Sequence, residues 1–179
     1  TLTSRDYAAL ADDAYINRER GRREIGSEER VTLNGYQYKV IEHADDPATG
    51  YQGTLYQRMS TGELIVSHRG TQEMVKDAVV TDLSMLAVRT NPQAAPALEL
   101  TRSAITEAQL LSAGREAPLK VTVTGHSLGG TLAQITAHHH DLKGETFNAY
   151  GAVGLHGLRI PEGGSNLINH VMATDPVSA

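Results

Sequence analysis

The sequence predicts an α/β protein in which helices cover both faces of a mainly parallel sheet. Short segments rich in β-branched residues alternate along the chain with segments of helical periodicity, which is the pattern of such sheets. A strand, a glycine-rich turn and a helix follow one another directly around residues 125–130. The chain of 179 residues is long enough for one hydrophobic core and short for two, so we expect a single domain over residues 1–179.

The first part of the chain is predicted to hold one helix and three strands. Thr3 or Ser4 can cap a helix that has Asp6 in its first turn, and apolar residues then recur at helical spacing as far as Tyr15. The charged segment Asn17–Arg30 indicates a solvated loop, with a basic membrane-facing patch as the alternative. Alternating residues and intervening turns predict strands at Tyr36–His43, Tyr51–Met59 and Leu64–His68.

The rest of the chain is predicted to alternate between helices and strands. Helical spacing recurs from Met74 to Leu86, and Asn91–Pro96 interrupts the chain. Pro96 suits the first position of a long helix that ends near Ala113, before Gly114. The remaining elements are a strand at Leu119–Thr124, a helix at Leu128–His140, and strands at Glu145–Tyr150 and Leu167–Ala173.

The composition excludes several classes of site. The balance of 16 basic and 21 acidic residues gives a net charge of −5, which argues against a nucleic-acid-binding surface. The chain has no cysteine, so disulfides, thiolate zinc sites and cysteine nucleophiles are excluded. No apolar run reaches the roughly 18 residues that a transmembrane helix needs, so we expect no transmembrane segment.

The segment Gly125–Gly130, with the sequence GHSLGG, has the form of a nucleophile elbow. The pattern Gly-x-Ser-x-Gly is satisfied by Gly125, Ser127 and Gly129 between a predicted strand and a predicted helix. Such a turn pushes the serine hydroxyl out of the sheet, and the glycines are needed because neighbouring backbone passes very close. The pattern therefore predicts that Ser127 is a nucleophile, the alternative being a glycine-rich turn with an incidental serine.

Three further segments, together with GHSLGG, resemble the class 3 lipases in order and approximate spacing. They are a strand ending in Arg69-Gly70-Thr71, a strand at Thr146–Ala152 that runs into small residues, and a strand ending in Asp175-Pro176-Val177. The resemblance covers about residues 64–177 and implies an α/β-hydrolase-type fold. Two positions depart from the family pattern. His68 stands where an aromatic residue is usual, and Tyr150-Gly151 replaces a common proline.

The resemblance implies roles for four residues of an esterase site. Ser127 would attack the ester carbonyl and form an acyl-enzyme. The backbone N–H groups of Leu128 and Thr71 would stabilise the negative oxygen of the intermediate. Asp175 would orient the catalytic histidine. The plainer interpretations are a turn-forming Asp-Pro for Asp175 and a helix cap for Thr71.

The same resemblance predicts a lid over the segment from Gln72 to about Asn91. This segment directly follows the predicted oxyanion strand and is more apolar than a surface helix needs to be. Asp82 matches the aspartate at the base of the family's lid, so we expect it to hydrogen-bond Thr71 and to preorganise the oxyanion hole. An ordinary core helix is the alternative.

The catalytic histidine is missing from its expected place. Triad order in this fold is Ser, Asp, His, and no histidine follows Asp175. Eight histidines lie upstream, and of these only His156 and His170 are near enough to Asp175 in sequence to test as a base. We therefore expect that the base lies outside these 179 residues and that the C-terminal part of the fold is missing. Either the chain continues, or another part or copy of the protein supplies the base.

These features together predict a serine esterase that acts on a lipid ester, either a triacylglycerol or the sn-1 or sn-2 ester of a phospholipid. No metal or organic cofactor is required for this chemistry, and transient contact with a lipid surface or membrane is expected. An inactive lipase-like binding module is the alternative from another class. By analogy with small bacterial lipase-like effectors, a secreted phospholipase that a cognate inhibitor protein controls also fits, which favours delivery outside the producing cell.

Overall fold

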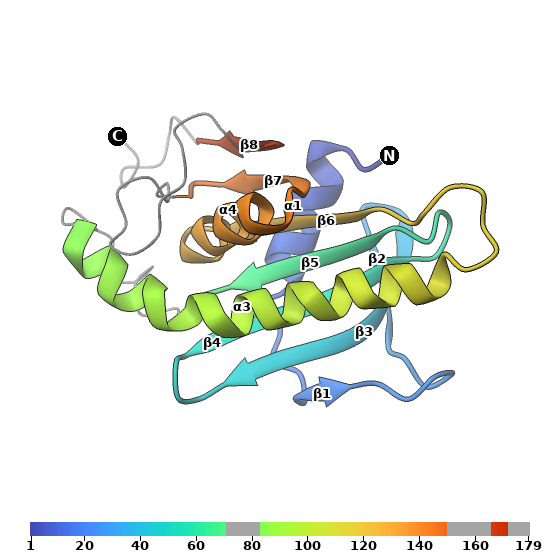
Figure 1. Cartoon of the computed structure of the whole chain (residues 1–179), viewed down its shortest axis with the longest axis horizontal. Helices are drawn as coiled ribbons and strands as arrows, with labels where there is room; N and C mark the ends of the chain where they lie inside the picture. The colour runs from blue at the N-terminus through green and yellow to red at the C-terminus, as the bar shows by residue number, and fades with distance from the viewer. Residues whose placement is uncertain (71–82, 150–165, 172–179) are drawn as a thin grey trace.

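The structure, a computed structural model, describes residues 1–70, 83–149 and 166–171. Its elements are arranged around one sheet (Figure 1). In chain order they are α1 (Ser4–Asp13), β1 (Gly21–Arg22), β2 (Arg30–Leu33), β3 (Tyr36–Asp46), β4 (Tyr51–Arg58), β5 (Leu64–Arg69), α3 (Leu83–Leu111), β6 (Val121–His126), α4 (Leu128–His140), β7 (Lys143–Phe147) and β8 (Asn166–His170).

The sheet is mixed rather than mainly parallel. Its strand order is β1-β3-β4-β5-β6-β7-β8, with β2 paired to β3. The pairings from β1 to β5 are antiparallel, and those from β5 to β8 are parallel. The antiparallel part arises because short turns reverse the chain: Gly50 N–H donates to Asp46 C=O at 2.8 Å, and Gly62 N–H donates to Arg58 C=O at 2.8 Å. The expectation of parallel strands holds for the part that contains β6.

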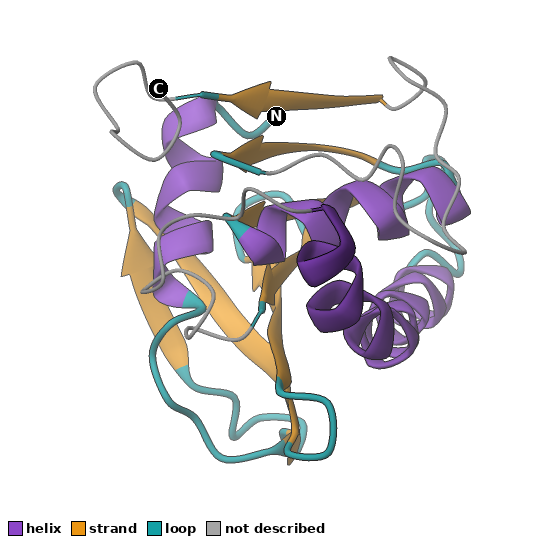
Figure 2. Ribbon diagram, turned by 90° about the vertical axis from the view of Figure 1, so that its left-hand side faces the viewer, coloured by secondary structure: helices purple, strands orange, loops and turns teal. Residues whose placement is uncertain are grey.

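Helices cover both faces of the sheet, as the sequence predicts (Figure 2). On one face, Tyr7 and Leu10 of α1 pack in a cluster with Tyr38, Tyr56 and Ile65 of the strands. On the other face, α3 and α4 form a second cluster with β3, β4, β5 and β6. Leu64 and Val66 of β5 belong to one cluster and Ile65 between them to the other, and all six residues of the strand are buried. A strand that is buried on both faces gives a rigid support for whatever follows its carboxyl end.

The first helix is held by a capping box, which confirms the predicted cap. The Thr3 side chain accepts a hydrogen bond from the Asp6 N–H, and the Asp6 side chain accepts one from the Thr3 N–H. Asp6 is buried and also accepts hydrogen bonds from Asn34 and Arg58. Burial alone would raise the pKa of Asp6, but these hydrogen bonds and the Arg58 charge lower it overall.

The third helix corrects a prediction, because the chain is not broken between Asn91 and Pro96. A single helix, α3, runs from Leu83 to Leu111 and contains Pro92 and Pro96. Each proline removes one N–H donor and crowds the preceding turn, and Figure 1 shows the helix changing direction in its first part. Pro92 and Pro96 lie four residues apart and therefore on one face of the helix. The helix continues through both prolines, and other residues of α3 pack on the sheet. Among the α3 residues whose burial is described, the buried apolar ones are Ala94, Ala97, Leu100, Ala104 and Ala108.

The arginines between α1 and β2 mostly bind other parts of the protein. The Arg18 side chain is 3% exposed and forms ion pairs with Asp13 at 2.7 Å and Glu29 at 3.2 Å. Arg22 pairs with Glu107 of α3, and Arg23 donates to backbone carbonyls of its own loop. These contacts do not favour the alternative in which the segment presents a basic patch to a membrane.

Candidate functional site: the turn at Ser127

Ser127 stands between the last residue of β6 and the first residue of α4, where the sequence predicts a sharp turn. Its backbone has φ 56° and ψ −120°, a conformation that a residue with a side chain rarely adopts. The turn is held at both ends, because the Ser127 N–H donates to Phe147 C=O at 2.9 Å and its C=O accepts from Thr131 N–H at 3.1 Å. Strained backbone of this kind persists only where surrounding structure enforces it, and it is concentrated at functional sites.

The glycines around Ser127 are required by close packing. A Cβ at Gly125 would overlap the carbonyl group of Gly129, and a Cβ at Gly129 would overlap the carbonyl oxygen of His68. Gly70, just beyond β5, leaves room for the Leu128 side chain. The first turn of α4 therefore lies directly against the end of β5.

The Ser127 hydroxyl is hydrogen-bonded to the ring of its neighbour. Its Oγ lies 2.9 Å from Nδ1 of His126, and Ser127 is 5% exposed. The imidazole is itself held in place, since the Tyr15 hydroxyl donates to the His126 carbonyl at 3.5 Å and the two rings meet edge to face. His126 occupies a variable position of the Gly-x-Ser-x-Gly pattern, and this contact was not predicted from the sequence. The signal was an imidazole directly beside the serine.

Leu128, the expected oxyanion donor, directly follows Ser127 in the turn. It is the first residue of α4, so its N–H has no acceptor within the helix. Its side chain is 1% exposed and belongs to the core cluster that also contains residues of the sheet and of α3. The positive end of the helix dipole lies at the same point.

The end of β5 beside this turn is anchored by a buried arginine. Arg69 is 6% exposed, and its Nη1 donates to the carbonyl of Tyr15 at 3.1 Å and to the side-chain oxygen of Gln52 at 3.0 Å. Its guanidinium lies over the Tyr15 ring. Burial lowers the pKa of Arg69. These contacts connect the segment after α1 to the strand that leads into Thr71.

Several predicted site residues lie outside the described residues. They are Thr71, Asp82, Asp175, His156 and the part of the predicted lid from Gln72 to Asp82. The part of the predicted lid from Leu83 to Asn91 forms the start of α3. His170 is described, and it faces Glu145: its Nε2 lies 2.6 Å from Glu145 Oε1, and its ring stacks on Phe147.

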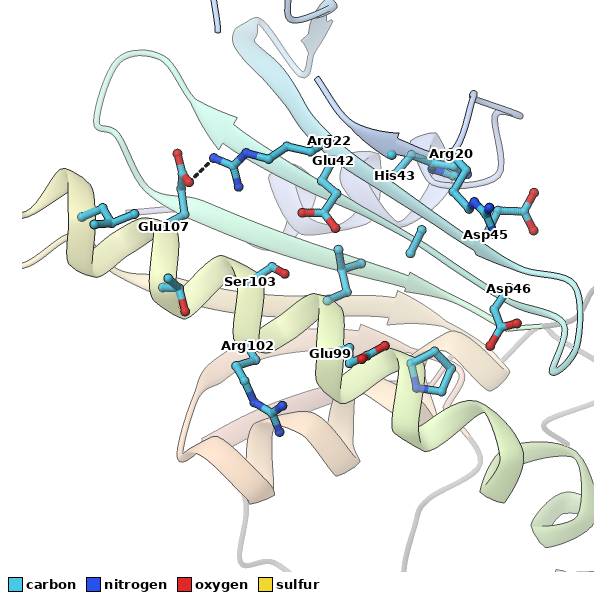
Figure 3. A pocket seen from close by; sticks show the side chains of 16 residues that line it. Arg20, Arg22, Glu42, His43, Asp45, Asp46, Glu99, Arg102, Ser103 and Glu107 are labelled. Carbon is cyan, nitrogen blue, oxygen red and sulfur yellow. Dashed lines mark hydrogen bonds and ion pairs between the residues drawn. The ribbon is translucent and has the colours of Figure 1, made fainter. Parts of the chain in front are cut away.

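A groove of about 730 Å³ lies elsewhere, between α3 and the strands β1 and β3 (Figure 3). Arg22 reaches across it to Glu107, and the Glu42 side chain lies beside this ion pair. Burial raises the pKa of Glu42. Neither Ser127 nor Leu128 lines this groove, so it is separate from the turn.

Two further observations concern the described residues alone. The residues that the structure describes include no group of three or more histidine, aspartate or glutamate side chains arranged to hold a metal ion. None of their helices combines the length and the apolar character needed to cross a membrane.

Comparison with known proteins places this geometry in a family. The family model of the Tle-like phospholipase domain, described as phospholipase-like, matches residues 6–170. Lip2 lipase from Yarrowia lipolytica is 18% identical with a TM-score of 0.50, and the match covers 93% of this chain and 68% of that one. A triacylglycerol lipase from Penicillium expansum is 19% identical with a TM-score of 0.49, and the match covers 81% of this chain and 58% of that one.

The matches also have limits in extent. No curated protein sequence matches this chain. The chain spans 58% of the length of the Penicillium lipase. The likeness to the Yarrowia lipase shows the fold of this chain alone. Because the family model covers nearly all of the sequence, the chain belongs to the Tle-like phospholipase domain family, and its fold is of the lipase-type α/β-hydrolase class.

Proposed function

We propose that this domain hydrolyses a carboxylic ester of a phospholipid through an acyl-enzyme on Ser127. The observation that carries the proposal is the position of Ser127, in positive-φ backbone at the carboxyl end of a buried parallel strand and at the start of α4. This position presents a hydroxyl beside the N–H groups of a helix start, which is the arrangement that acyl transfer needs. The family match favours a phospholipid over a triacylglycerol.

In the proposed reaction, Ser127 Oγ bonds to the ester carbonyl carbon while its proton passes to a base. The carbonyl oxygen becomes negative and is stabilised by the Leu128 N–H and, in the family's arrangement, by Thr71. The ester C–O bond then breaks, and the departing lysophospholipid alcohol takes the proton. Water attacks the acyl-enzyme in the same way, releases a fatty acid and restores Ser127.

For the base, we propose an imidazole from outside these 179 residues, oriented by Asp175. His126 contacts Ser127 Oγ, but a triad imidazole is held by a carboxylate on its second nitrogen. Among the residues that the structure describes, no carboxylate hydrogen-bonds the His126 ring. We interpret the His126 contact as the resting partner of the hydroxyl. The proposal also includes the lid expected over Gln72 to about Asn91 and a hydrogen bond between Asp82 and Thr71. It includes a lipid-surface contact and a cognate inhibitor protein as well.

The test compares Ser127→Ala with a matched control, Ser103→Ala, in the natural full-length protein. Ser103 lies on α3 at the separate groove, so removing its hydroxyl should leave ester turnover unchanged. We expect Ser127→Ala to lose turnover of phosphatidylcholine vesicles by several orders of magnitude and to escape labelling by a serine-directed fluorophosphonate. Fatty-acid release from phospholipid and triacylglycerol dispersions distinguishes the two substrate classes. Full turnover in Ser127→Ala, or labelling at another serine, would contradict the assignment.

A further inference from the structure

His68 is a fully buried imidazole whose two ring nitrogens have partners from three other elements. Its Nδ1 lies 2.6 Å from the Tyr51 hydroxyl of β4. Its Nε2 lies 3.0 Å from Thr136 Oγ1 of α4 and 3.4 Å from Thr101 Oγ1 of α3. The residue is 1% exposed, so it meets no solvent. These contacts join β5 to a neighbouring strand and to both helices on one face of the sheet.

The partners determine which nitrogen carries the proton. Thr136 Oγ1 donates its one proton to Ala133 C=O, and Thr101 Oγ1 donates its one proton to Ala97 C=O. Both hydroxyls can then only accept from His68, so the proton is on Nε2. Nδ1 is left without a proton and accepts the Tyr51 hydroxyl. Burial lowers the pKa of His68 to about 3, which keeps the ring neutral.

The main chain of His68 lies directly against the turn that contains Ser127. In the parallel pairing of β5 with β6, His68 is the partner of Gly125. The His68 carbonyl is packed against Gly129, and Gly70 is packed against the side chain of Leu128. The hydrogen bond from the ring to Thr136 therefore ties the same residue to α4 a second time, further along that helix.

We propose that His68 is a positioning residue for catalysis at Ser127, because its hydrogen bonds to Tyr51 and Thr136 set how the end of β5 meets the first turn of α4. This inference rests on the proposed function. In that reaction the end of β5 and the Leu128 N–H both border the oxygen that becomes negative. A purely apolar ring would fill the space without direction, whereas hydrogen bonds fix both the distance and the rotation of α4.

The experiment uses His68→Phe, Tyr51→Phe and the double variant in the full-length protein. His68→Phe leaves the Tyr51 hydroxyl buried without a partner, and the double variant removes that unsatisfied group. We expect His68→Phe to lower kcat for a soluble phospholipid by about 10- to 100-fold, with KM changed by about twofold or less. The double variant should regain thermal stability while kcat stays low. Tyr51→Phe alone should fold and should lower kcat by a few-fold.

A structural role alone would give a different pattern, in which stability and kcat recover together in the double variant. That result, or wild-type kcat in a folded His68→Phe, would overturn the inference. His68→Gln should retain more kcat than His68→Phe, because its amide can donate to Thr136. Failure of the proposed function is separate: wild-type protein would then neither turn over phospholipid nor be labelled at Ser127 by fluorophosphonate.

Discussion

Replacing Gly129 with alanine should damage the site by pushing α4 away from β5. A Cβ at this position would lie 2.8 Å from the carbonyl carbon of His68 and closer still to its oxygen, whereas ordinary contact begins at 3.4 Å. Both groups are backbone, so no flexible side chain can move aside. The first turn of α4 must shift by at least about 0.6 Å relative to the strand, which is comparable with the misplacements that slow enzymes.

Two opposing effects decide the stability of Gly129→Ala. Alanine is favoured over glycine in a helix by about 1 kcal/mol. Forcing an extra carbon into a packed region costs about 1–3 kcal/mol, and here it meets rigid backbone, so the cost should win. For a protein of this size, each kcal/mol shifts Tm by about 2–4 °C. We therefore expect a Tm lower by a few degrees and a kcat lower by about 100-fold.

The assay pairs thermal unfolding with turnover of a phospholipid, and Gly114→Ala is the control. Gly114 has φ 81° and nothing within 4 Å of an added Cβ, so alanine there costs only the strain of left-handed backbone, about 1–2 kcal/mol. The control should lose stability and keep its kcat. If Gly129→Ala folds and turns over substrate like the wild type, the close contact between α4 and β5 does not control the site.

Three other substitutions test neighbouring features. His126→Asn should keep turnover within about tenfold if an outside imidazole is the base, and a loss as deep as that of a nucleophile variant would make His126 the base instead. The pKa of Asp6 is lowered on folding, so the ionised carboxylate stabilises the folded protein at neutral pH, and this stabilisation is lost as the pH falls below about 4. In urea unfolding, the stability of Asp6→Asn should therefore depend less on pH in that range than the stability of the wild type. Asp13→Ala leaves Arg18 buried with only Glu29 as a carboxylate partner and should cost about 3 kcal/mol in chemical denaturation, whereas wild-type stability would show that Glu29 suffices.

Much of the local structure could be predicted from the sequence because it depends on neighbouring residues. The predicted cap of the first helix is present at Thr3, with Asp6 in the first turn. The glycines on either side of Ser127 predict a tight strand-to-helix turn, and the structure has one at that place. Periodicity and turn-forming residues act over a few positions, so the patterns that encode them can be read directly.

The sequence by itself determined a strand, a tight turn and a helix around Ser127, and through its motifs a resemblance to lipases that the family match supports. Only the tertiary structure decided the rest. It showed that the sheet is mixed, that α3 runs through its prolines, and that His126 bonds the serine hydroxyl. It also placed His68 among Tyr51, Thr101 and Thr136, which lie 17, 33 and 68 positions away in the sequence. A buried polar side chain is defined by the partners that satisfy it, and those partners are brought together only when distant segments pack.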